Sequence, residues 1–329
     1  NYHKTYYVPN NMAICLSGDF DPEQMLSIIE KYFGQMEPNK ELPEVDFETK
    51  TVIESPVSKE VYGLDAENIM IGWKYPGAGT QEALVADVVS YILSNGSAGL
   101  IDLNLNQQQK VLGAQAMSYT RPDAGEFLIM ADPKQGQTLD EVKDLVLAEI
   151  AKLRAGEFDE ALLTGTINNM KLRQMRMLES NSDRADMFVQ SFINGTDWAD
   201  EVAWLDNLSK VTKQDVIDWA NNYLGENNYA IIYKRQGEDK TVQKVSAPKI
   251  TPIKANRDAQ SAFLAEIQAT EVTPIEPVYV DYDKDMSIFD VNGLEVLYAQ
   301  NELNDITSVT YSYNKGATQD PALNLAFNY

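Results

Sequence analysis

The chain has 329 residues, and its 50 Asp and Glu against 27 Lys and Arg give a formal net charge of −23. This excess of acidic residues argues against nucleic acids and anionic membrane surfaces as partners, because both are bound through basic patches. Basic or neutral peptides remain plausible partners. Hydrophobic residues make up 44% of the chain, enough to bury cores, and the length is typical of about two domains. No apolar run approaches the ~20 residues of a membrane-spanning helix.

The first clear structural signals lie near the N-terminus. The apolar residues 12–16 predict a buried strand. Within it, Cys15 is the only cysteine of the chain and is expected to be a small core residue. Asp21 and Pro22 then predict a helix N-terminus, since Asp accepts a backbone N–H and the missing N–H of Pro costs nothing at the first helical position. An apolar stripe follows, and Gly34 predicts the end of this helix.

A longer region predicts a sheet and its covering helices. Alternating apolar residues and turn signals predict strands over 60–64, 68–75, 113–119, 126–131 and 229–233. Helical periodicity predicts helices over 82–93, 98–109 and 138–156, and a mostly helical run over 159–223. This order predicts an α+β fold, with a mainly antiparallel sheet covered by helices. We expect this fold to form a domain over residues 1–235.

The remainder of the chain differs in composition. Residues 236–284 are polar and contain four prolines, which predicts a linker with one short helix over 256–268. Two strands are then predicted, over 294–300 and 306–314, and a helix from Ala322. These elements predict the start of a second, truncated domain over 285–329.

Three stretches together carry a family resemblance. They are YYVPNNMAICLSGDFDPEQMLSIIEKYFGQM (6–36), SNGSAGLIDLNLNQQQKVLGAQAMSY (94–119) and VNGLEVLYAQNELNDITSVTYSYNKGATQDP (291–321). In order and spacing they resemble the insulinase/pitrilysin family of zinc metallopeptidases, which includes the mitochondrial processing peptidases. The resemblance implies two similar halves, each of two α/β subdomains, that close around an unfolded peptide. It also implies that residues 1–235 are the non-catalytic second subdomain of a first half, and that the second half begins after residue 285.

The family's zinc site requires an H-x-x-E-H helix and a further Glu. This chain has a single histidine, His3, and no such helix. We therefore expect no catalytic zinc site and no cofactor in this chain. The resemblance places the zinc in a catalytic subdomain of the parent protein, upstream of Asn1. The implied partners are that missing subdomain, the second half and a peptide substrate.

The family's other half carries an Arg and a Tyr that stabilise an oxyanion. The resemblance aligns Gln107 with that Arg and Ala114 with that Tyr, so this segment is not expected to be catalytic. Asn95, Ser97, Gln107 and Gln109 are candidates for lining a substrate chamber, and ordinary amphipathic packing is the competing interpretation. A stripe of apolar residues also predicts core packing, with an adaptable peptide-binding surface as the alternative. It comprises Met170, Leu172, Met175, Met177 and Leu178.

Three functions therefore stay open. The leading hypothesis is a fragment of a zinc-dependent metalloendopeptidase that forms the chamber, clamps peptide and is inactive alone. The second is a family member without catalysis that serves as a scaffold or partner subunit. The third is an acidic peptide- or sugar-binding domain unrelated to proteolysis. Relatives with this charge and a single cysteine are often bacterial and exported, which favours the periplasm or cell envelope.

Overall fold

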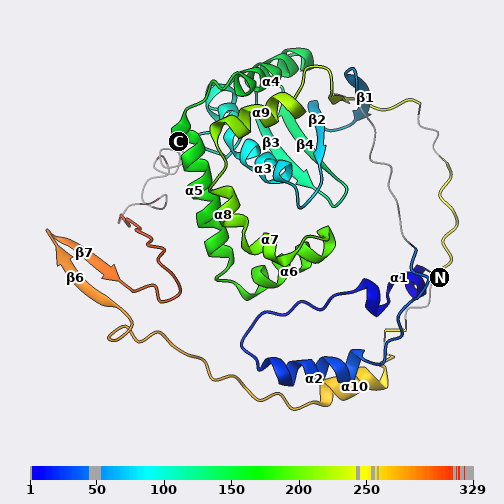
Figure 1. Ribbon diagram of the computed structural model, residues 1–329, viewed down its shortest axis with the longest axis vertical. Coiled ribbons are helices and arrows are strands. Elements are labelled where there is room, and N and C mark those ends of the chain that lie inside the picture. The colour runs from blue at the N-terminus through cyan, green and yellow to red at the C-terminus, as the bar shows by residue number, and fades with distance from the viewer. Residues whose placement is uncertain are drawn as a thin grey trace. The chain divides into compact units, whose positions relative to one another are not determined.

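A computed structural model describes residues 2–43, 53–241, 245–252, 256–257, 259–313, 316, 318 and 322 (Figure 1). The chain divides into two compact units, residues 1–243 and 244–329. The boundary between the units falls within the stretch 236–284, for which the sequence predicts a linker. Among the described residues, no helix is both long and apolar enough to cross a lipid bilayer.

The first unit contains a five-stranded sheet in the order β1-β5-β2-β4-β3. The strands are β1 (Val57–Gly63), β2 (Asn68–Pro76), β3 (Gly113–Thr120), β4 (Ala124–Asp132) and β5 (Ala230–Gln236). The pairs β2–β5, β2–β4 and β3–β4 are antiparallel, and only the edge pair β1–β5 is parallel. This arrangement confirms the predicted α+β fold with a mainly antiparallel sheet.

One face of the sheet forms the core. Ile69, Ile71 and Trp73 alternate along β2 and are at most 1% exposed, and Phe127 and Ile129 of β4 are fully buried beside them. Three helices contact the sheet at this layer (Figure 1). They are α3 (Gln81–Leu93), α4 (Leu139–Arg154) and α9 (Lys213–Tyr223). The burial follows from the period of two in a strand, which places alternate side chains on the same face.

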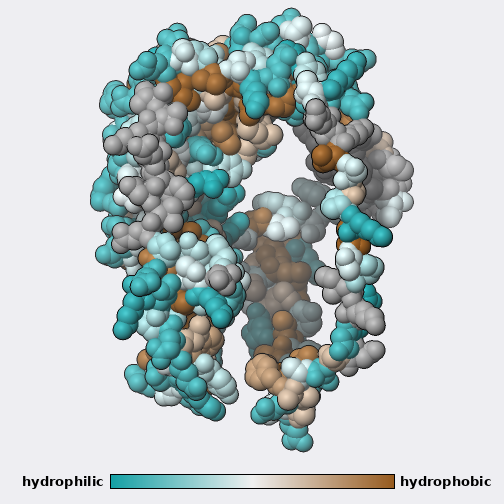
Figure 2. Space-filling view, turned by 90° about the vertical axis from the view of Figure 1, so that its right-hand side faces the viewer, coloured by the Kyte–Doolittle hydropathy of each residue, from teal (hydrophilic) through white to brown (hydrophobic). Residues whose placement is uncertain are grey.

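The opposite face of the sheet remains accessible. Met70 of β2, Met117 of β3 and Leu128 of β4 alternate with the core residues and are only half buried, and Ile232 of β5 is 39% exposed. Hydrophobic surface is visible in the upper part of Figure 2, where this sheet lies. The sheet is thus covered by helices on one side and presents apolar side chains on the other.

A run of four helices connects α4 to α9. It comprises α5 (Glu160–Met177), α6 (Asn181–Asn194), α7 (Trp198–Val202) and α8 (Trp204–Leu208). The side chains of Asp159 and Ser180 cap α5 and α6 by accepting backbone N–H groups. Helix α5 packs against α3, and this contact forms the site described below.

The N-terminal segment departs from the prediction. Helix α2 (Pro22–Phe33) begins with Asp21, whose carboxylate accepts the Gln24 N–H at 2.8 Å, and it ends at Gly34 as expected. It follows α1 (Tyr2–Tyr6) and a 3₁₀ turn, Pro9–Asn11. No residue of α2 is buried.

The strand predicted over residues 12–16 is wrong. These residues have no regular structure, Met12, Ile14 and Leu16 are 41–45% exposed, and Cys15 is only half buried. An apolar stretch becomes a strand only where a neighbouring strand supplies partners for its backbone groups. No described strand pairs with this segment.

The second unit is sparsely packed. It contains α10 (Ala262–Ala269) and a hairpin of β6 (Ser287–Val291) with β7 (Leu294–Tyr298). Asn292 and Gly293 form the turn with φ of 53° and 82°, the left-handed pair that an Asn-Gly hairpin favours. None of the described residues after position 244 is buried.

Two predictions for this unit need correction. Strand β6 was not predicted from the sequence, and residues 306–313, predicted as a strand, have no regular structure. Residues 306–313 have no strand partner within the described residues. Like residues 12–16, they therefore do not form a strand. Position 314, and the helix predicted from Ala322 beyond that residue itself, lie outside the described residues.

Candidate functional site

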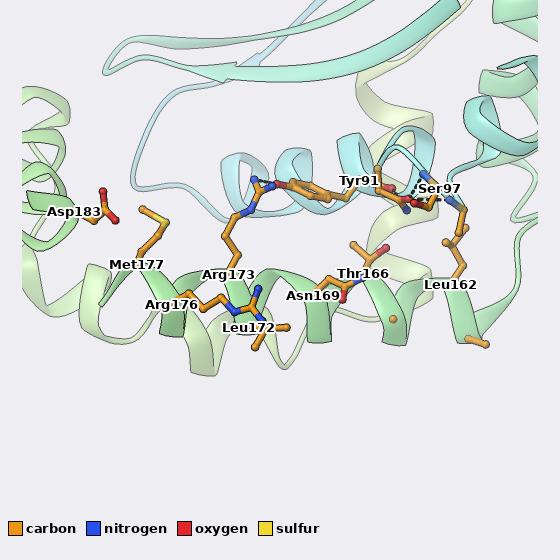
Figure 3. Close-up of a pocket in the computed structure, with 14 residues that line it drawn as sticks. Tyr91, Ser97, Leu162, Thr166, Asn169, Leu172, Arg173, Arg176, Met177 and Asp183 are labelled. Carbon is orange, nitrogen blue, oxygen red and sulfur yellow. Dashed lines mark hydrogen bonds between the residues drawn. The ribbon is translucent and has the colours of Figure 1, made fainter. Parts of the chain in front are cut away.

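A pocket of about 610 Å³ lies between α5 and the C-terminal part of α3 with the loop that follows it (Figure 3). Tyr91 of α3 and the loop residues Asn95 and Ser97 form one wall. Residues of α5 at helical spacing form the other wall; among them are Leu162, Gly165, Thr166, Asn169, Leu172, Arg173, Arg176 and Met177. Asp183 of α6 lies at the end of the pocket opposite Ser97 (Figure 3).

The loop is held in place by a buried carboxylate. Asp102 is 5% exposed and accepts the backbone N–H groups of Asn95 at 2.7 Å, Gly96 at 2.8 Å and Gly99 at 3.2 Å. Gly96 has a φ of 84°, a conformation that suits glycine. The Asn95 side chain in turn accepts the N–H groups of Ser97 and Ala98. The loop wall of the pocket is therefore defined by its own hydrogen bonds.

The segment after the loop is a shorter helix than predicted. Of the helix predicted over 98–109, residues 98–99 belong to the loop and only residues 100–106 are helical, ending in the π-helical turn η2 (Asp102–Asn106). Before the helix, the carboxylate of Asp102 accepts backbone N–H groups of the loop. After the helix, Gln109 has a φ of 51°, which is not helical. The local hydrogen bonds of the loop thus delay the helix start.

The four candidate residues have different positions. Asn95 and Ser97 line the pocket. Gln107 does not line it, but its side chain donates to the Ser97 carbonyl at 2.8 Å and so supports the loop. Gln109 neither lines the pocket nor contacts its loop among the hydrogen bonds described. Ala114, which aligns with the family's Tyr, is 9% exposed at the start of β3.

The pocket is connected to an edge of the sheet. The Asn106 amide of η2 binds the backbone of Ala114 in both directions, accepting its N–H and donating to its carbonyl, each at 2.9 Å. Strand β3 is an edge strand, and beyond Ala114 no described strand pairs with its outer side. The side-chain amide thus takes the place of a neighbouring strand at one position.

The positive charge on α5 is a feature of the pocket that was not predicted from the sequence. Between residues 161 and 178 the chain has Lys171, Arg173 and Arg176 but no acidic residue. The Arg173 guanidinium donates to the Tyr91 hydroxyl and lies 5.4 Å from the centre of that ring. The stretch of basic residues without acidic ones could have been found in the sequence. Its position against the loop could not.

The apolar stripe on α5 divides between core and pocket. Met170 is 6% exposed and belongs to the core. Leu172 and Met177 are half buried and line the pocket, whereas Leu178 is 40% exposed. The Thr166 hydroxyl in the α5 wall is buried and has no hydrogen-bond partner. The pocket therefore combines apolar surface, two arginines and an unsatisfied polar group.

A second polar cluster lies between α3 and the sheet and does not line the pocket. The Ser118 hydroxyl donates to the Asp87 carboxylate at 2.5 Å, and the hydroxyls of Tyr75 and Thr120 are 2.8 Å apart. Burial raises the pKa of Asp87, and the hydrogen bond from Ser118 opposes this shift. Burial also raises the pKa of Tyr75 to about 12. These groups join α3 to β3 at the core.

The residues of the chain do not fit a catalytic zinc ion. His3 is exposed in α1, where its ring stacks on Tyr7 at 4.5 Å. Over the described part of the chain, no three His, Cys, Asp or Glu side chains are grouped as metal ligands. The sequence also lacks the pair of histidines that such a site needs. No catalytic step through zinc follows from this chain.

Residues 1–170 match the family model described as "Peptidase M16 inactive domain". The chain belongs to the M16 peptidase family. This membership confirms the resemblance to insulinase/pitrilysin-type zinc metallopeptidases. A curated relative is the zinc protease PqqE of Helicobacter pylori, 24% identical over 248 residues that cover 70% of this chain and 53% of PqqE. This M16 chain thus spans about half the length of that relative.

Solved structures of similar proteins support the same fold. A protease from Helicobacter pylori superposes with a TM-score of 0.67 at 20% identity, covering 71% of this chain and 57% of that one. The first half of the periplasmic protease PqqL from Escherichia coli gives a TM-score of 0.54 at 14% identity, over 71% and 53% of the two chains. At these identities the similarity shows the fold alone.

Proposed function

We propose that this chain is a non-catalytic wall of a peptide-processing chamber in an M16 zinc peptidase, and that it clamps extended peptide without cutting it. The observation that carries the proposal is the pocket between α5 and the loop at 95–99, which is open, preformed and joined to an edge strand. The accessible sheet face with Met117, Leu128 and Ile232 adds apolar surface to the same unit.

A bound peptide has two kinds of contact available. A side chain can enter the pocket, where Asn95 and Ser97 form one wall. The backbone can add to the free edge of β3, since an unpaired strand edge offers N–H and C=O groups to an extended chain. Asn106 lies between these two sites in the sequence. Its side chain binds the Ala114 backbone and so holds η2 against β3.

The remaining parts of the proposal concern the whole protein. Catalysis and zinc belong to a catalytic subdomain outside this chain, and residues 285–329 begin a second half. That subdomain, the second half and the peptide substrate are the partners, and the chain alone is inactive. PqqL is described as periplasmic, and we propose the periplasm or cell envelope for this protein as well.

Filling the pocket tests the peptide-binding role. A Cβ added at Gly165 meets no atom within 4 Å, so Gly165→Leu places a side chain in the pocket without a clash and removes a glycine from a helix. Thr164→Leu adds the same side chain at the preceding position of α5, which is exposed and does not line the pocket. We expect Gly165→Leu to weaken binding of an unstructured, uncharged peptide at least about tenfold, and Thr164→Leu to leave it unchanged. Equal binding by both variants, or no binding by the unchanged chain, would contradict the proposal.

A second experiment concerns catalysis. Zinc content and peptide cleavage are measured side by side on the 329-residue chain and on the longer protein that the proposal implies. Zinc and cleavage in the longer protein alone support the clamp role. If neither protein binds zinc or cleaves, the role of scaffold or partner subunit replaces it. Cleavage by the 329-residue chain would overturn the assignment as a non-catalytic domain.

A further inference from the structure

The pocket has a charge opposite to that of the chain as a whole. The net charge of the chain is −23, yet the charged side chains that line the pocket are Arg173, Arg176 and Asp183. Both arginines are on α5, and Asp183 is at the far end of the pocket from the loop (Figure 3). The two arginines lie between the loop and Asp183 (Figure 3), so the charge in the middle of the pocket is positive.

The two arginines are available to a ligand. Arg173 binds the hydroxyl of Tyr91, a neutral partner that leaves the guanidinium charge uncompensated. In the described part of the chain, the Arg176 guanidinium forms neither an ion pair nor a hydrogen bond, and neither arginine is paired with Asp183. A guanidinium offers several N–H donors in a planar fork that matches a carboxylate.

Apolar and polar side chains of α5 accompany the arginines in the pocket wall. Leu172 and Met177 flank them on α5 and are half buried. The hydroxyl of Thr166, which is 3% exposed, lacks a partner in the same wall. An acidic residue beside an apolar residue would match this surface, with the carboxylate on the arginines and the apolar side chain on Leu172 and Met177.

We propose that the pocket selects peptides with an Asp or Glu side chain, and that Arg173 and Arg176 bind that carboxylate. The inference rests on the proposed peptide-binding function and specifies the chemistry of its ligand. Long-range repulsion from the acidic chain would oppose any acidic peptide, so a contact at short range has to supply the preference. Selectivity would then depend on the two arginines and not on net charge.

A purely structural role for the arginines makes a different prediction. Basic residues near the C-terminus of a helix are stabilised by its dipole. If this were their only role, their removal would lower the stability of α5 and leave peptide selectivity unchanged. A binding measurement with matched peptides therefore separates the two roles.

The test is calorimetric titration of the full 329-residue chain with two unlabelled, C-terminally amidated peptides. They have the same length and apolar residues and differ only by Glu or Gln at one central position. We expect the Glu peptide to bind about tenfold more tightly than the Gln peptide, as a charge-assisted hydrogen bond would give. This advantage should shrink at high salt. Equal affinities would overturn the inference, whereas continued binding of the Gln peptide would leave the proposed function intact.

Two variants and a control assign the effect to the arginines. In R173Q/R176Q, the affinities for the Glu and Gln peptides should differ by no more than about twofold. R176Q alone, which removes no described contact, should reduce the preference for the Glu peptide. Lys171→Gln removes one positive charge from the same helix outside the pocket and should preserve it. A preference that persists in R173Q/R176Q, with folding checked by circular dichroism, would refute the assignment.

A final peptide distinguishes two sources of carboxylate. The Gln peptide is prepared with a free C-terminus in place of the amide. We expect it to bind like its amidated form, because the inference concerns a side chain within the peptide. If the free terminus restores tight binding, the pocket recognises chain ends, and the assignment to an acidic side chain is wrong.

Discussion

The N-terminal segment and the sheet of the first unit are built from similar local signals but have different outcomes. In the sheet and its helices, each apolar stripe meets another, and residues such as Ile71 and Phe127 are fully buried. Helix α2 also has a side-chain cap at its N-terminus and an amphipathic pattern, yet none of its residues is buried. Phe33, on α2, is 46% exposed.

The comparison shows that the signals that specify where a helix forms are distinct from the packing that stabilises it. Caps and periodicity specify where a helix begins and ends. They contribute little free energy unless the apolar face is buried, because most helical stability in proteins comes from tertiary packing. The following predictions use matched substitutions in the two kinds of region.

The largest difference is expected for removal of a phenyl ring. Phe127→Ala leaves a cavity in the core and should lower the free energy of unfolding by about 3–5 kcal/mol. Phe33→Ala, on α2, should change it by less than about 0.5 kcal/mol. Urea denaturation followed by tryptophan fluorescence measures both, since Trp73 and Trp219 lie in the core. A large effect of Phe33→Ala would show that α2 packs on the sheet.

A smaller difference is expected for two aspartates that accept backbone N–H groups. Asp102→Ala leaves three N–H donors of the pocket loop without their acceptor and should cost about 2–3 kcal/mol. Asp21→Ala removes the cap of α2 and should change only the local helix, because no buried contact depends on it. Global unfolding reports the first effect, and amide hydrogen exchange in α2 reports the second. Equal effects on global unfolding would contradict the distinction between the two regions.

The buried carboxylate of Asp87 predicts a pH dependence. Its pKa is raised from 3.8, so the folded state binds this proton more tightly than the unfolded state. The resulting stabilisation is fully present below pH 3.8 and is lost as the pH rises through the raised pKa. Asp87→Asn keeps an acceptor for Ser118 but has no charge to bury.

The stability of Asp87→Asn relative to the unchanged protein should therefore increase as the pH rises from about 4 towards neutrality. The slope is at most about 1.4 kcal/mol per pH unit, because a single proton is involved. Urea midpoints measured across this pH range provide the test. Parallel profiles for the two proteins would show that Asp87 does not titrate differently in the folded state.

The smallest difference is expected for two hydroxyl caps. The Thr138 hydroxyl accepts the Glu141 N–H at 3.2 Å at the start of α4, whose apolar face is buried. Thr138→Ala should cost about 1 kcal/mol of global stability. Ser261 caps α10 in the same way, at 3.1 Å, but α10 has no buried residue. Ser261→Ala should therefore leave the main thermal transition unchanged, and a shift as large as that of Thr138→Ala would contradict this expectation.

The sequence by itself determined the local features of this protein. The cap at Asp21 and the apolar alternation of the strand over 68–75 were predicted because each depends on residues a few positions apart. The lack of a zinc motif was equally evident, since His3 is the only histidine. The family resemblance followed from the order of three local motifs.

The tertiary structure decided which of these elements found partners. Residues 12–16 have the pattern of a strand but no partner, whereas β1 pairs in parallel with β5, about 170 residues away in the sequence. The pocket likewise depends on a distant contact, because Tyr91 and Arg173 are 82 positions apart. Caps and periodicity act between neighbours along the chain. Strand pairing and binding sites depend on backbone and side-chain groups from distant segments, which only the folded chain brings together.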